Sequence, residues 1–72
     1  MNYSYKLSSV IIEGERHNTY DIYIENDNAV LNKLSDFSTD VDEVISFINY
    51  LEIYQISSEK LIEAAQDFLD QL

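Results

Sequence analysis

Apolar and polar residues alternate through the first part of the chain, which is the period of a β-strand whose successive side chains point to opposite faces of a sheet. The apolar positions keep one parity up to Leu7 and take the other parity from Val10 onward. This change predicts a bulge or a break in the strand at Ser8-Ser9. The apolar residues that define this first strand are Tyr3, Tyr5, Leu7, Val10 and Ile12.

Two further strands are expected, each introduced by a polar segment typical of a turn. Residues 13–18 are polar and contain the only glycine, which predicts a hairpin loop before a strand centred on Ile22. Asn26-Asp27-Asn28 predicts a second hairpin turn, because Asn and Asp tolerate the left-handed backbone that such turns need. The third strand is expected from Ala29 to about Leu34.

The second half of the chain changes to the helical period of 3.6 residues. A first helix is expected from about Asp40 to Tyr50, with Ser38, Thr39 or Asp40 as its N-cap; if Asp40 is the cap, Glu43 stands three residues later in a capping-box arrangement. Ser57 or Ser58 is expected to cap a second helix. The predicted apolar face of that helix consists of Leu61, Ile62, Ala65, Phe68, Leu69 and Leu72.

These elements predict one α+β domain over residues 1–72, a three-stranded antiparallel β-meander followed by a two-helix hairpin packed on one face. Neither layer can bury its apolar face alone, so both are expected to share one core. No Pro or Gly cluster divides the sequence, and no run of about 18 apolar residues predicts a membrane-spanning helix. We therefore expect a cytoplasmic protein.

Charge is the strongest signal in the composition. Fourteen acidic side chains stand against four Lys and Arg, which gives a formal net charge of −10 on 72 residues. Repulsion on this scale weakens the compact state, but it favours solubility and the attraction of a basic partner. Direct nucleic-acid binding is not expected, because contact with the phosphate backbone requires many Lys and Arg side chains.

Three short runs carry a resemblance to a known family. They are Thr19-Tyr20-Asp21-Ile22, Leu34-Ser35-Asp36-Phe37-Ser38-Thr39-Asp40 ahead of a helix with Val44, and Ala65-Gln66-Asp67-Phe68-Leu69. The chain from about Thr19 onward resembles a group of short uncharacterised proteins of low-GC Gram-positive bacteria, known only as a domain of unknown function. The resemblance implies a fold and a source in such a bacterium or its phage, and it implies no activity.

Residue types that perform catalysis are scarce, so an enzyme is not expected. The chain has no Cys, and its only histidine, His17, lies in the polar segment beside Arg16. The single Gly14 cannot form a glycine-rich phosphate-binding loop. No cofactor is therefore predicted.

One segment imitates part of a calcium-binding loop, because Asp36, Ser38, Asp40 and Asp42 occupy the spacing of its first four ligands. The position that requires Gly is Val41, and the position that requires a bidentate acid is Phe47. No metal site is predicted, and these side chains are expected to cap the helix that follows.

The second helix carries a row of carboxylates that we call the acidic stripe. Its members are Glu59, Glu63, Asp67 and Asp70, at spacings of four, four and three residues. Such spacing places them on one helix face, about 5 to 6 Å apart and roughly opposite the predicted apolar face. The stripe is either a solvated surface or an imitation of a row of nucleic-acid phosphates that occupies a basic groove on another protein.

Six tyrosines accompany these charges. Four of them, Tyr3, Tyr5, Tyr20 and Tyr23, are expected to pack in the sheet. Tyr50 and Tyr54 flank the connection between the helices and are the predicted aromatic contacts of a partner.

Two functions fit this sequence. The first is a non-enzymatic acidic protein-binding module, an inhibitor or regulator that occupies a basic nucleic-acid-binding protein by DNA mimicry, with the profile of phage inhibitors of bacterial defence nucleases. The alternative is a structural or housekeeping protein that self-associates as a homodimer through its sheet, with the acidity serving solubility. The two functions differ in their salt dependence, because screening weakens a charged interface and not an apolar one.

Overall fold

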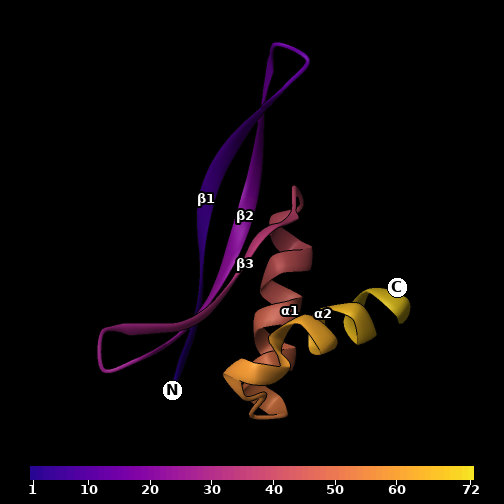
Figure 1. The fold of residues 1–72 in the computed structure, drawn as a ribbon. Coiled ribbons are helices and arrows are strands. Elements are labelled where there is room, and N and C mark those ends of the chain that lie inside the picture. The colour runs from indigo at the N-terminus through magenta and orange to yellow at the C-terminus, as the bar shows by residue number, and fades with distance from the viewer.

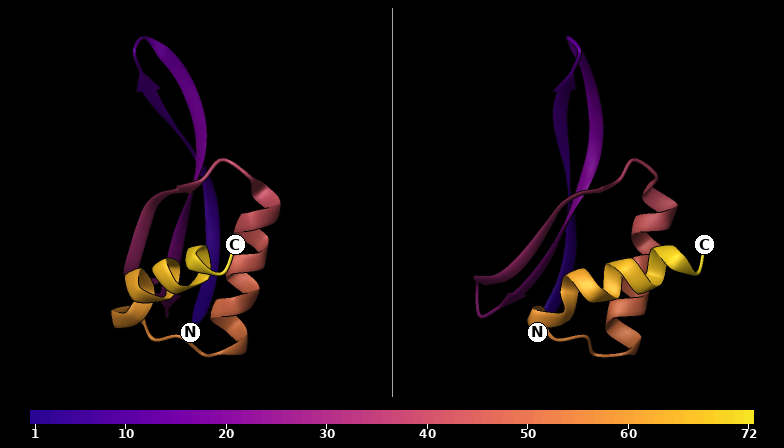
Figure 2. Two further views of the ribbon diagram at one scale, coloured as in Figure 1. Left: turned by 90° about the vertical axis from the view of Figure 1, so that its right-hand side faces the viewer. Right: turned by 45° about the vertical axis from the view of Figure 1, so that its right-hand side comes forward.

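Three antiparallel strands precede two helices in the computed structural model, which describes residues 1–72 (Figure 1). The elements are β1 (Asn2–Ile12), β2 (Glu15–Asn26), β3 (Ala29–Ser38), α1 (Val41–Ile53), the 3₁₀ turn η1 (Ser58–Lys60) and α2 (Leu61–Asp70). The strands lie in the order β1-β2-β3, which confirms the predicted α+β class and element order. Both helices lie on one side of the sheet, where α2 crosses α1 (Figure 2). No helix is long and apolar enough to cross a membrane.

Two-residue turns connect the strands. Ile12 pairs with Glu15, so Glu13 and Gly14 alone form the first turn, with φ values of 52° and 82°. The loop expected over residues 13–18 is therefore wrong beyond Gly14, because the residues after it continue β2. The second turn is formed by Asp27-Asn28, also at positive φ, as its residue types predict.

β1 pairs with β2 without interruption from Asn2 to Ile12, so the predicted bulge or break at Ser8-Ser9 is wrong. Cross-strand pairs share a face, and the face that contains Tyr3 and Ile24 is directed toward the helices. β3 pairs with β2 only between Tyr20 and Asn26, so the far part of the β1–β2 hairpin projects beyond the rest of the protein (Figure 1). Apolar residues of both parities are exposed there, and the alternation therefore carries no information about this part of β1.

β3 continues to Ser38, four residues beyond its predicted end, because a bulge interrupts its pairing without ending it. Leu34 pairs with Ile22 and Ser38 pairs with Tyr20, so three residues of β3 lie opposite Asp21 alone.

Hydrogen bonds hold the centre of this bulge. The backbone N–H of Asp36, which has φ of 54°, donates to the carboxylate of the buried Asp21 over 2.9 Å. The Asp36 carboxylate accepts the hydroxyl of the buried Thr19 over 2.8 Å. These bonds satisfy buried polar groups and stabilise the left-handed backbone at Asp36.

The core lies between the sheet and the two helices. It takes residues from β2, α1 and α2: Ile22, Ile24, Val44, Phe47, Ile48, Leu51, Leu61, Ala64 and Ala65. Phe37, placed by the bulge, stacks on the fully buried Phe47 with ring centroids 4.5 Å apart. Ile62 and Leu69 are exposed and Leu72 follows the end of α2, so the predicted apolar face of this helix is wrong at these positions.

Helix α1 begins at the predicted place, but the capping box expected with Glu43 is absent, because the Asp40 N–H donates to the Ser38 hydroxyl oxygen. Asp40 is its N-cap and accepts the backbone N–H of Asp42 over 2.9 Å. The predicted end at Tyr50 is wrong, because α1 continues to Ile53 and closes with a Schellman motif. In that motif the N–H of Ile56 donates to the Leu51 carbonyl, and Gln55 adopts a φ of 51°.

The second helical segment begins differently from the prediction. Neither Ser57 nor Ser58 caps it through its side chain, because η1 precedes α2 and the Ser57 carbonyl accepts the N–H of Lys60 instead. Asn32 of β3 donates its side-chain N–H to the Ser58 carbonyl over 2.6 Å, which attaches η1 to the sheet.

Candidate protein-binding surface

The acidic stripe is divided between two elements. Glu63, Asp67 and Asp70 are exposed on α2, where the spacing of 3.6 residues per turn places them away from the buried Leu61 and Ala65. Glu59 is also exposed, but it lies on η1 and not on the α-helix from which its alignment was predicted. The regular row of carboxylates therefore comprises the three residues of α2, with Glu59 one turn before them.

The acidic side chains of the two helices and the segments beside them, which form the helical layer, have almost no basic side chains to neutralise them. Residues 40–72 contain a single basic side chain, Lys60, whose Nζ lies 3.5 Å from the Glu63 carboxylate at an exposed site. Such exposed pairs contribute about 0 to 1 kcal/mol, so the negative potential of the layer remains. The acidic residues of this part of the chain are Asp40, Asp42, Glu43, Glu52, Glu59, Glu63, Asp67 and Asp70.

Two of the other cations lie on the opposite side of the sheet. Tyr23 belongs to the strand face that points away from the core, and Lys6 and Lys33 lie over its ring at 4.9 Å and 5.8 Å from the centroid. The same face also carries Asp21 and Glu25, but residues 1–39 have six acidic against three basic side chains and residues 40–72 have eight against one, so the negative charge is concentrated in the helical layer.

Tyr50 and Tyr54 differ in their surroundings. Tyr50 is half-buried, with its ring 6.2 Å from Phe47 and 5.7 Å from Phe68 of α2. Tyr54 is 65% exposed and contacts Tyr50, with ring centroids 5.0 Å apart. Tyr50 thus extends the core between the helices, and Tyr54 carries this aromatic cluster to the surface beside α2.

The four strand tyrosines pack in or on the sheet. Tyr3 and Tyr20 contact the core, Tyr5 meets Tyr20 edge to face at 5.8 Å, and Tyr23 lies beneath the two lysines. These positions confirm the predicted sheet packing of the tyrosines in β1 and β2.

An apolar groove of about 260 Å³ lies between β3 and α2. Leu34 and Phe37 line it from the two sides of the bulge, and Ile62 and Leu69 line it from α2. Asp36 stands at the same groove, so a carboxylate accompanies its apolar wall. Sequence reasoning missed this groove; the available signal was the three-residue spacing of Leu34 and Phe37, which breaks strand alternation and is typical of a bulge.

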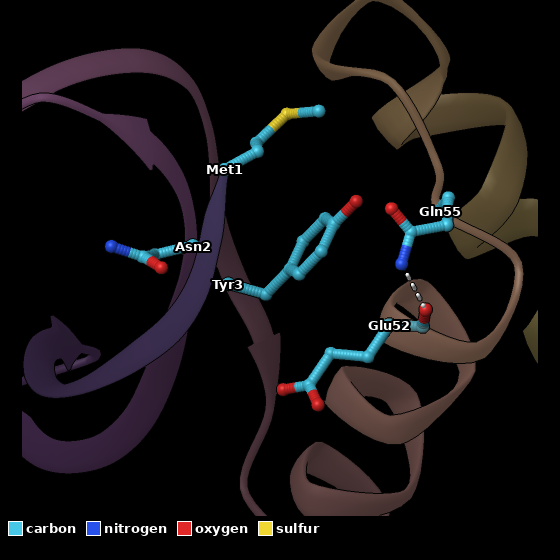
Figure 3. Close-up of a pocket in the computed structure, with 5 residues that line it drawn as sticks. All are labelled: Met1, Asn2, Tyr3, Glu52 and Gln55. Carbon is cyan, nitrogen blue, oxygen red and sulfur yellow. Dashed lines mark hydrogen bonds between the residues drawn. The ribbon is translucent and has the colours of Figure 1, made fainter.

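A second, more polar pocket of about 570 Å³ lies where β1 starts and α1 ends (Figure 3). The Tyr3 hydroxyl donates to the Ile56 carbonyl over 2.7 Å, and the Gln55 side chain donates to the Glu52 carbonyl over 3.2 Å. Burial, and secondarily the negative charge of Glu52, raises the pKa of the Tyr3 phenol. The neutral phenol therefore acts as a structural hydrogen-bond donor that joins β1 to the segment after α1.

The calcium-like spacing corresponds to a strand-to-helix junction. Asp36 belongs to the bulge, Asp40 caps α1, and the Ser38 hydroxyl oxygen accepts the N–H of Asp40 over 3.0 Å. Of the three predicted cap candidates, Asp40 is the one that caps the helix. Nowhere in residues 1–72 do three or more His, Cys, Asp or Glu side chains gather as a group able to hold a metal ion.

No family model, curated protein or solved structure shows significant similarity to this chain. The resemblance to short proteins of low-GC Gram-positive bacteria accordingly stays a prediction from the sequence.

Proposed function

We propose that this protein is a non-enzymatic binding module whose acidic helical layer occupies a basic, nucleic-acid-binding surface of another protein. The observation that carries the proposal is the exposed row Glu63, Asp67 and Asp70 on α2, in a layer whose only cation is Lys60. Negative charges recur about once per helical turn along this row, so a groove that holds a phosphate backbone meets a comparable line of charge.

The cost of assembling these charges supports a role for them. Like charges three or four residues apart on a helix each weaken it by a few tenths of a kcal/mol, and Lys60 relieves only Glu63. Three such carboxylates without further cations reduce the stability of a small domain. A function in binding accounts for this cost, because the same charges steer a basic partner toward α2.

The neighbouring surface provides contacts that charge alone does not. The groove beside α2 exposes Ile62 and Leu69, and Tyr54 is exposed near the end of α1. Protein interfaces are enriched in aromatic residues and depleted of Asp and Glu, so Tyr54 and the apolar side chains would supply the buried contacts while the carboxylates attract and orient the basic partner.

The test is a pull-down with the tagged protein from a lysate of a low-GC Gram-positive bacterium, with captured proteins identified by mass spectrometry. We expect a basic nucleic-acid-binding protein that elutes with salt and is displaced by added duplex DNA. A Glu63→Gln/Asp67→Asn variant should lose this capture. A Glu13→Gln/Glu15→Gln variant removes the same charge at the far hairpin turn and should keep it.

Two outcomes contradict the proposal. Equal capture by the wild type and the Glu63→Gln/Asp67→Asn variant would mean that the stripe is a solvated surface. Capture that duplex DNA does not displace would mean that the partner is not held through its nucleic-acid-binding surface.

A further inference from the structure

The outer edge of β1 has no partner in the sheet. The strand order β1-β2-β3 leaves β1 at an edge, and its pairing with β2 extends over all residues from Asn2 to Ile12. Edge strands of natural proteins are usually short, or carry Pro, bulges or several charges that prevent further pairing. β1 has none of these features except one charged residue, Lys6. Its free edge is therefore suited to accept another strand.

Helix α1 overhangs this edge. Figure 2 (left) shows α1 on the β1 side of the sheet, while α2 begins on the β3 side and runs toward α1, and α1 contacts β1. Val41, Ile45 and Glu52 share one side of α1, because four- and seven-residue spacings return to the same side of a helix. That side is turned toward β1, since Glu52 lies at the Tyr3 pocket.

Apolar side chains remain uncovered at this place. Val41 and Ile45 are 36% and 42% exposed on α1, and on the helix-facing side of β1 Leu7 is 61% exposed and Ile11 is also exposed. A strand added at the edge of β1 would lie beneath α1 and cover these residues. The protein thus has a prepared position for one more strand.

Charge selects the strand that fits this position. Residues 1–12 are the longest stretch of the chain without an acidic side chain, although the whole protein carries a net charge of −10. β2, α1 and α2 are net negative and β3 is neutral, whereas β1 carries only Lys6, so a second copy of this acidic chain is least repelled at β1. A basic strand, by contrast, meets no carboxylate on β1 itself, whose only charged side chain is Lys6.

We propose that β1 pairs antiparallel with β1 of a second copy, in a two-fold symmetric dimer centred on Leu7. This register uses the whole of β1 and places Leu7 against Leu7 and Tyr3 against Ile11 of the second copy. Centring the pair on Lys6 shortens the overlap and sets two like charges directly opposite each other, which is unfavourable. Pairing β1 with β1 also satisfies the requirement of a two-fold symmetric dimer that both copies use the same surface in the interface.

The dimer has one continuous six-stranded sheet with both pairs of helices on one side. Leu7 of each copy then lies beneath α1 of the other, near Val41 and Ile45, and Ile11 lies beside Tyr3 at the Glu52 end of that helix. α2 packs against the Tyr50 side of α1, which is opposite Val41 and Ile45, so both acidic stripes stay accessible. The inference is therefore independent of the proposed function.

The experiment is sedimentation equilibrium of the full chain at several concentrations and two salt concentrations. We expect a concentration-dependent dimer that strengthens with salt, because screening reduces the repulsion between two copies of charge −10. Binding of a basic partner weakens under the same change, so the two proposals fail separately. A Leu7→Lys variant should raise the dimer Kd by at least about tenfold.

The matched control is Val30→Lys, which adds the same charge at a residue that is 56% exposed on β3, far from the proposed interface. It should leave the dimer Kd unchanged. A protein that stays monomeric at the highest concentration in high salt would overturn the inference, as would a dimer that Leu7→Lys leaves intact.

A cross-link tests the register itself. The chain has no cysteine, so a Leu7→Cys variant introduces one thiol per copy. Directly opposed residues of antiparallel strands have Cα atoms about 4.5 to 5.5 Å apart, within the range of about 4.4 to 6.8 Å that a disulfide spans. We expect mild oxidation to link the Leu7→Cys copies and to leave a Val30→Cys variant unlinked. Equal linking of the two variants would refute the register.

Discussion

The bulge of β3 depends on one buried carboxylate, and replacing Asp21 tests this dependence. Asp21 is 7% exposed, and its Oδ1 accepts the Asp36 N–H at 2.9 Å. A hydrogen bond to a charged group contributes about 1.5 to 3 kcal/mol, so we expect Asp21→Ala to lower the free energy of unfolding by about 2 kcal/mol. Domains of this size have a total stability of roughly 4 to 11 kcal/mol, at about 0.05 to 0.15 kcal/mol per residue. The loss is therefore a large part of the whole.

Asp21→Asn is the matched variant, because an amide oxygen still accepts the Asp36 N–H while the negative charge is removed. We expect it to cost less than about 1 kcal/mol, the scale of a neutral hydrogen bond. Thermal unfolding followed by circular dichroism measures both variants; about 2 kcal/mol corresponds to a fall in Tm of roughly 8 to 16 °C for a domain of this size.

Two results would refute the reasoning about Asp21. If Asp21→Ala unfolded within about 0.5 kcal/mol of the wild type, the range of an ordinary surface substitution, the bulge would not depend on this acceptor. If Asp21→Asn were as destabilised as Asp21→Ala, the charge and not the hydrogen bond would be essential.

Two further predictions concern the junction after α1. Tyr3→Phe removes the hydroxyl bond to Ile56 and should cost about 1 kcal/mol at neutral pH. The pKa of Tyr3 is raised in the folded protein, so the contribution of its hydroxyl to stability is complete below the pKa of the unfolded chain, near 10, and is lost as pH rises through the pKa of the folded protein. Urea unfolding should therefore show the stabilities of the wild type and Tyr3→Phe converging in strongly alkaline buffer. A difference that stays constant with pH would contradict this. Gln55→Gly should have a free energy of unfolding about 0.5 to 1 kcal/mol higher than Gln55→Ala, because both variants lose the side-chain bond to the Glu52 carbonyl and only Gly adopts the φ of 51° without steric cost. Equal or lower stability of Gln55→Gly than of Gln55→Ala in the same assay would show that the left-handed backbone there is not strained.

The sequence predicted most features that depend on neighbouring residues. The type of each element, their order, the Asp27-Asn28 turn and the Asp40 cap all follow from local periodicity and from side chains that bond to their own backbone. The exposed carboxylates of α2 were also predictable, because 3.6 residues per turn place Glu63, Asp67 and Asp70 on the side opposite the buried Leu61 and Ala65.

The parts of the candidate site that involve two distant segments were not predictable. Asp21 is an unremarkable polar position in β2 until Asp36 reaches it across the sheet, and the resulting bulge moves Phe37 onto Phe47. The groove beside α2 exists only because this bulge and Ile62 meet. A charged residue in a strand reads as solvent-exposed when its neighbours are unknown.

The first strand shows the same division between local and tertiary information. Alternation identified β1 as a strand, because period-two patterning requires only the pleat of the backbone. Its continuity past Ser8-Ser9 and its unprotected edge beneath α1 were decided by pairing with β2 and by the position of the helix. Periodicity in a sequence reflects which side chains are buried, and the projecting hairpin buries few of them. Only the tertiary structure could therefore show that the outer edge of β1 is free.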